Sequence, residues 1–133
     1  MVKYPNYYYY AAAAAATAIA GILHIVYASN LLGRGPPTFG IFFMISGLAQ
    51  LFWTLPMIKQ WGRIWYYIGI AGTIVLIIMY FMTRVPNPIT TRALPTSSMG
   101  IIIEIFEFIY IGITAYIVAR QGRIEPKQKE QLR

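Results

Sequence analysis

Four long blocks of apolar residues constrain the fold of this chain more than any other feature. They cover residues 8–29, 38–58, 64–83 and 99–119. Each block is close to the roughly 20 residues that a helix needs to cross the hydrocarbon core of a bilayer. Charged residues make up only 11% of the chain, against about 25% in soluble proteins. The sequence predicts an all-α integral membrane protein, a single domain (1–133) built as a bundle of four transmembrane helices.

The first block has a second interpretation. The segment YYYYAAAAAATAIAG resembles a secretory signal, with Ala18, Ile19 and Ala20 as a cleavage site. However, the apolar run continues through Val26, and the leader carries only one basic residue, Lys3. We therefore expect a retained helix, whose alanines and glycine form a face that another helix can approach closely.

The connections carry start and stop signals for helices. Gly33 can end the first helix, and Pro37 suits the opening of the second. Pro56 is expected to kink or stop the second helix. The very short joint at 59–63 predicts an antiparallel hairpin of spans two and three. Candidate N-caps for the fourth span are Thr96, Ser97 and Ser98.

The distribution of basic residues predicts the orientation. Eight lie on the side of the termini, in the leader, the second connection and the basic tail (120–133): Lys3, Lys59, Arg63, Arg120, Arg123, Lys127, Lys129 and Arg133. Three lie on the other side: Arg34, Arg84 and Arg92. The positive-inside rule then places both termini in the cytoplasm of a multi-pass protein of the cell membrane. The net charge of +7 fits this orientation and attraction to anionic lipids, and does not indicate a nucleic-acid partner.

Aromatic residues gather near the predicted cytoplasmic interface. We expect a belt there formed by Tyr7–Tyr10, Trp61, Trp65, Tyr66 and Tyr67.

The most unusual residues are Glu104 and Glu107, which lie inside the most apolar stretch, GIIIEIFEFIYIG. They are three residues apart, so they share one helix face, roughly 7 Å and 12 Å below the outer surface. His24 falls roughly 7 Å below the same surface. Arg84 and Arg92 also lie on this side. An intramembrane carboxylate needs a partner, so the sequence predicts a polar cluster in the outer half of the membrane.

Each predicted helix has one small or polar face, which we expect to point inward. These faces hold Thr17, Gly21, His24 and Ala28 in span one; Ser46, Gln50 and Thr54 in span two; Gly69, Thr73, Tyr80 and Arg84 in span three; and Gly100, Glu104, Glu107, Ile111 and Thr114 in span four.

Three functions are compatible with the predicted polar cluster. The first is structural: the two glutamates pair with arginines or with adjacent chains, and the protein is a small subunit of a larger membrane complex. The second is a metal or redox site with His24, Glu104 and Glu107 as ligands, a set that suits zinc, iron or manganese. The third is transport of a proton or cation by a glutamate, although the helices show no break at mid-membrane.

Several chemistries are excluded by composition. The chain has no cysteine and one histidine, so it offers no thiolate metal site, no iron–sulfur cluster and no bis-histidine haem. It contains no P-loop, GxGxxG or HExxH pattern.

The segment TRVPNPITTRALP, followed by GIIIE, resembles a group of small four-span membrane proteins of ammonia-oxidising archaea. The resemblance lies in Thr83–Thr90, Arg92, Pro95 and the spacing from Gly100 to Glu104, and extends over about 24–119. Some members of this group are accessory subunits of the archaeal ammonia monooxygenase, a copper membrane enzyme. The resemblance implies a helical subunit packed around the catalytic subunits, with copper only in those partners. The resemblance identifies no catalytic residues in this chain.

The residues and the resemblance both predict a non-catalytic accessory subunit of a hetero-oligomeric membrane complex. The resemblance implies that this complex is an oxidoreductase. The expected partners are other membrane subunits and lipid. This chain is expected to bind no cofactor itself. The loop at 84–98, with its prolines and arginines, is the predicted docking element.

Overall fold

The chain forms four long helices. The computed structural model describes residues 6–34, 37–88 and 93–132, and all regular secondary structure within them is helical. The helices are α1 (Tyr7–Leu32), α2 (Pro37–Ile58), α3 (Arg63–Thr83) and α4 (Ser98–Gln131). Each is long and apolar enough to cross a membrane, which confirms the prediction of four such helices. The helix of the fourth block extends through most of the predicted tail.

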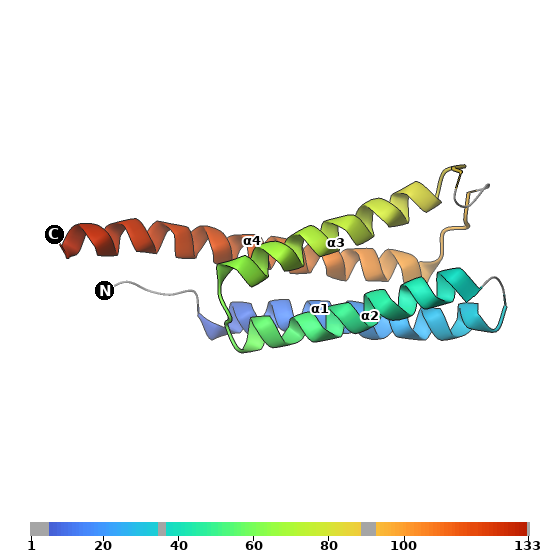
Figure 1. Cartoon of the computed structure of the whole chain (residues 1–133), viewed down its shortest axis with the longest axis horizontal. Coiled ribbons are helices and arrows are strands. Elements are labelled where there is room, and N and C mark those ends of the chain that lie inside the picture. The colour runs from blue at the N-terminus through green and yellow to red at the C-terminus, as the bar shows by residue number, and fades with distance from the viewer. Residues whose placement is uncertain (1–5, 35–36, 89–92, 133) are drawn as a thin grey trace.

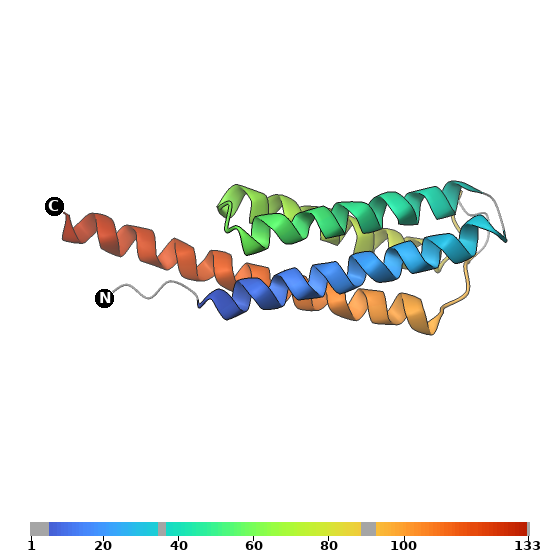
Figure 2. The same ribbon diagram turned by 90° about the horizontal axis from the view of Figure 1, so that it is seen from below.

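The helices run up and down as a bundle (Figure 1). α1 begins and α4 ends at one end, here called the terminal end. At the other, the loop end, α1 and α3 end and α2 and α4 begin. α1 packs against α2 and α4, while α3 packs against α4 and, least closely, against α2. The helices therefore form a ring, with α1 opposite α3 and α2 opposite α4. The last part of α4 projects beyond the other helices at the terminal end (Figure 2).

The tightest contact joins α1 to α2 through two glycines. A Cβ placed on Gly47 would lie 2.7 Å from the backbone oxygen of Gly21, and one on Gly21 would lie 2.8 Å from the oxygen of Gly47. No side chain larger than hydrogen fits between backbones this close. Small residues therefore set the α1–α2 distance, as in other membrane helix pairs.

Local sequence signals place the helix ends. Gly33 caps the C-terminus of α1, and Pro37 opens α2, both as predicted. Ser97 is the N-cap of α4, where its side chain accepts a hydrogen bond of 3.1 Å from the backbone N–H of Gly100. Pro56 does not stop α2 at once, because the helix continues to Ile58.

The hairpin of α2 and α3 is open. The two helices follow each other through a short turn, yet α3 diverges from α2 with distance from that turn (Figure 1). Only 22% of the most apolar window of α3 is buried, compared with 44% for α1. α3 thus has the largest share of surface left for lipid or for another protein.

Candidate functional site

Glu107 lies at the centre of the bundle and is only 1% exposed. Its Oε1 accepts a hydrogen bond of 2.7 Å from Nε2 of Gln50 and lies 3.9 Å from Nε2 of His24. Gln50 belongs to α2 and His24 to α1, so two other helices reach one carboxylate oxygen of α4. The compensation expected for Glu107 therefore comes from this chain.

The ring of His24 is oriented by its own helix. Nδ1 lies 3.0 Å from the carbonyl oxygen of Ala20, and because a carbonyl can only accept, Nδ1 is the donor. Nε2 then faces the carboxylate of Glu107. With Nδ1 protonated, Nε2 and the carboxylate are both acceptors unless a proton resides on one of them. The pair is therefore a place where a proton can be held.

Glu104 is also buried, at 8% exposure, but it is arranged differently. Its Oε2 has no hydrogen-bond partner in the part of the chain that the structure describes. Arg84 borders the same cavity, yet its guanidinium lies over the ring of Tyr80, 4.2 Å from the centroid. Arg84 thus acts on Glu104 electrostatically, without a hydrogen bond to Oε2, while its guanidinium makes this cation–π contact. Arg92, the other predicted partner, lies outside the described residues.

The cavity beside Glu104 occupies the loop end and has a volume of about 240 Å³. All four helices contribute to its wall, and so does the loop between α3 and α4. Most of the wall is aromatic or aliphatic. Its polar members are His24, Tyr27, Thr38, Tyr80, Thr83, Arg84, Asn87 and Glu104. The cavity therefore gives Glu104 and His24 a route toward the loop end.

The alternative metal site is not assembled. Within residues 6–34, 37–88 and 93–132, no group of three or more His, Cys, Asp or Glu side chains is placed to hold a metal ion. Glu107 is directed at Gln50, whereas Glu104 lines the cavity. Although His24, Glu104 and Glu107 are all buried in the bundle, they do not converge as three ligands.

A second hollow, the α2–α3 groove, runs along the open seam between these two helices and has a volume of about 250 Å³. Small or polar residues line much of it: Ser46, Ala49, Gln50, Gly69, Gly72 and Thr73. A Cβ added to Gly72 would meet nothing within 4 Å. Oε1 of Gln50 is buried and has no hydrogen-bond partner among the described residues. The groove thus leaves open space between two helices, while the side chain of Gln50 reaches past it to Glu107.

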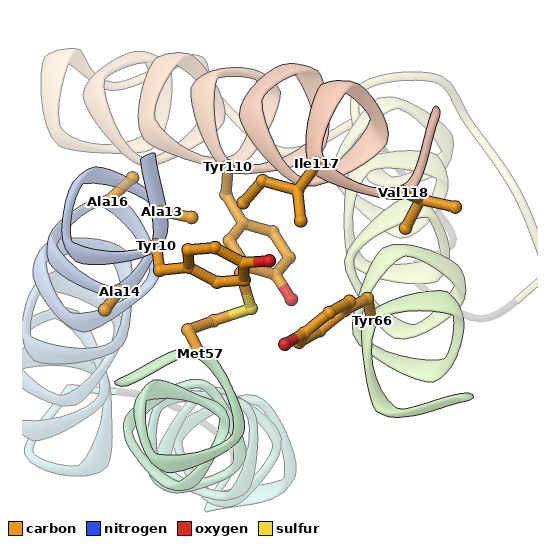
Figure 3. Close-up of a cluster of buried hydrophobic side chains, with 9 residues drawn as sticks. All are labelled: Tyr10, Ala13, Ala14, Ala16, Met57, Tyr66, Tyr110, Ile117 and Val118. Carbon is orange, nitrogen blue, oxygen red and sulfur yellow. The ribbon is translucent and has the colours of Figure 1, made fainter. Parts of the chain in front are cut away.

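Three tyrosines form a feature that the sequence reasoning missed. Tyr10 and Tyr66 were expected in the aromatic belt, but they are 3% and 0% exposed and lie in the core with Tyr110. Figure 3 shows their hydroxyls directed into the space between the helices. The rings of Tyr10 and Tyr66 are 6.0 Å apart. The helical spacing indicates the buried position of both residues. Tyr10 lies on the same helix face as Thr17, and Tyr66 lies on the same face as Gly69.

Comparison of the chain with protein-family models, with curated proteins and with solved structures finds no match. The described residues provide a carboxylate held by two helices, a second carboxylate facing a cavity, and an open groove between α2 and α3.

Proposed function

We propose that this protein is a non-catalytic subunit of a larger membrane complex, with another subunit's transmembrane helix seated in the α2–α3 groove. The observation that carries this proposal is the groove itself. Small residues on its walls, Ala49 and Gly72, allow a second backbone to approach, and the hydroxyls of Ser46 and Thr73 donate to carbonyls of their own helices. A helix with small residues on one face fits these walls.

The groove also explains why α3 packs so loosely. A bundle that had only to pack with itself would close the seam between α2 and α3 and gain van der Waals contact between the two helices. A partner helix in the groove would contact both α2 and α3. The docking element then includes the α2–α3 groove in addition to the loop at 84–98.

The proposal for the identity of the complex rests on the sequence resemblance around Arg84 and Glu104. It points to a copper membrane monooxygenase, the ammonia monooxygenase of archaea, as the complex. In this arrangement both termini are cytoplasmic, the complex lies in the cell membrane, and copper is bound by the partners.

Filling the groove should release the subunit. We expect tagged wild-type protein, extracted from its native membrane with a mild detergent, to co-purify with a fixed set of larger membrane subunits. Gly72→Leu should abolish this association because its side chain would occupy the space of the partner helix. Mass spectrometry of the purified material measures both results.

Gly112→Leu is the matched control. A Cβ at Gly112 also meets nothing within 4 Å, but this residue lies on α4, away from the groove. It should retain the partners. Wild-type protein that emerges alone would refute the subunit role, and partners unrelated to a monooxygenase would refute only the identity of the complex.

A further inference from the structure

Unpartnered polar atoms follow the interior of the bundle from one end to the other. Buried side-chain atoms without a hydrogen-bond partner among the described residues include those of Glu104, Glu107, Tyr110, Thr114, Gln121, Gln50 and Tyr66. In folded proteins such atoms are rare, and buried water usually satisfies them. Seven residues of this kind in one small bundle place a row of polar groups along its interior, in which Tyr110 interacts with Thr114 and Tyr66 with Gln121.

These residues line up on α4. Glu104, Glu107, Tyr110 and Thr114 are spaced by three, three and four residues, so they occupy one helix face. Gln121 continues this face two turns later. From Glu104 to Gln121 the face extends about 25 Å along the helix axis, close to the ~30 Å thickness of the hydrocarbon core.

Tyrosines from two other helices bridge the interval between Thr114 and Gln121. Tyr66 of α3 and Tyr10 of α1 direct their hydroxyls into this part of the interior (Figure 3). The hydroxyl of Tyr10 accepts a hydrogen bond of 2.9 Å from Nε2 of Gln121. We call the following row the polar path, which adds Tyr10 and leaves out Gln50: Glu104, Glu107, Tyr110, Thr114, Tyr66, Tyr10 and Gln121.

The polar path is accessible at both ends. At the loop end Glu104 lines the cavity, which His24 and Arg84 also border. At the terminal end Gln121 is only half-buried, and Arg123 beyond it is exposed. Glu107 is the constriction between the two parts, because Gln50 and His24 hold it.

We propose that the polar path conducts protons through the bundle. Glu104 takes a proton from the cavity, Glu107 receives it, and the hydroxyls of Tyr110, Thr114 and Tyr66, with water bound between them, pass it to solvent beside Gln121 at the terminal end. Each oxygen accepts a proton on one side and releases one on the other, so no net bond change occurs. The groups facing the carboxylates from the other helices are His24 on α1, Gln50 on α2 and Arg84 on α3. Buried carboxylates in membrane proteins commonly serve in proton relays.

Proton flux in liposomes tests this inference. The purified full-length chain is reconstituted around a pH-sensitive dye, and flux is driven by a potassium gradient with valinomycin. We expect flux well above that of protein-free liposomes. Glu107→Gln should lower it by roughly a hundredfold, the lower part of the range for a positioned proton-transfer group. Tyr110→Phe, which removes only a hydroxyl, should also lower it.

Tyr116→Phe is the matched control, because Tyr116 is 38% exposed on the outside of α4. It should leave the flux unchanged, and circular dichroism should show the same helix content in all variants. Wild-type flux equal to that of empty liposomes would overturn the proposal. So would flux that is insensitive to both Glu107→Gln and Tyr110→Phe. Neither result bears on subunit assembly, which the Gly72→Leu experiment measures separately.

Discussion

Gly47→Leu is expected to destabilise the bundle by about 3 kcal/mol or more. Its Cβ alone would lie 2.7 Å from the backbone oxygen of Gly21 and 2.7 Å from Cγ1 of Ile25. Backbone cannot move aside like a flexible side chain, so α1 and α2 would have to separate. Far-UV circular dichroism during a titration with a denaturing detergent measures the change in the free energy of unfolding.

Gly112→Leu serves as the control for this substitution as well. It gains the same helix propensity, but its Cβ meets nothing within 4 Å. We expect its free energy of unfolding to stay within about 0.5 kcal/mol of the wild type. Equal unfolding midpoints for the two variants would show that the glycine contact does not determine the stability of α1 against α2.

The helices and their inward faces could be predicted from the sequence. Blocks of about 20 apolar residues in a chain with 11% charge leave few alternatives to membrane-spanning helices. The face of the fourth block followed from the spacing of Glu104 and Glu107, and both residues are buried as expected. Gly33 and Ser97 marked helix ends because their backbone and side-chain chemistry acts locally.

Distances between helices could not be predicted in the same way. Helical periodicity says which residues share a face, but not which two helices approach most closely. The contact of Gly21 with Gly47 and the open seam of α2 and α3 depend on the packing of all four helices. The two acidic residues differ for the same reason: Gln50 reaches Glu107 from α2, whereas Arg84 turns to Tyr80 one helical turn away.

The aromatic residues show a further limit. Tyrosine is expected at membrane interfaces, and this rule assigned Tyr10 and Tyr66 to a belt. The structure buries both in the core, where their hydroxyls join the interior polar atoms. The positions of Tyr10 and Tyr66 along the helix axis predicted an interfacial location. Their positions around the helix, on the inward face, determine that they are buried.

The second large effect is expected for Glu107→Ala, with a loss of about 3 kcal/mol from the free energy of unfolding. The hydrogen bond from Gln50 accounts for only part of this, since interhelical hydrogen bonds in membranes contribute about 1 kcal/mol. The remainder comes from the void left by a side chain that is 1% exposed and from the donor of Gln50 left unpaired.

Glu107→Gln separates these causes because it keeps the volume and an acceptor oxygen for Nε2 of Gln50. We expect it to cost about 1 kcal/mol or less. Glu130→Ala, at an exposed site on the projecting part of α4, should change the free energy of unfolding by less than about 0.5 kcal/mol. If Glu107→Gln is as damaging as Glu107→Ala, the negative charge beside His24 stabilises the bundle more than its shape does. If Glu107→Ala matches Glu130→Ala, the carboxylate does not join α1, α2 and α4. Burial of Glu107 would then reflect a functional role of the carboxylate, such as proton transfer, and not a contribution to stability.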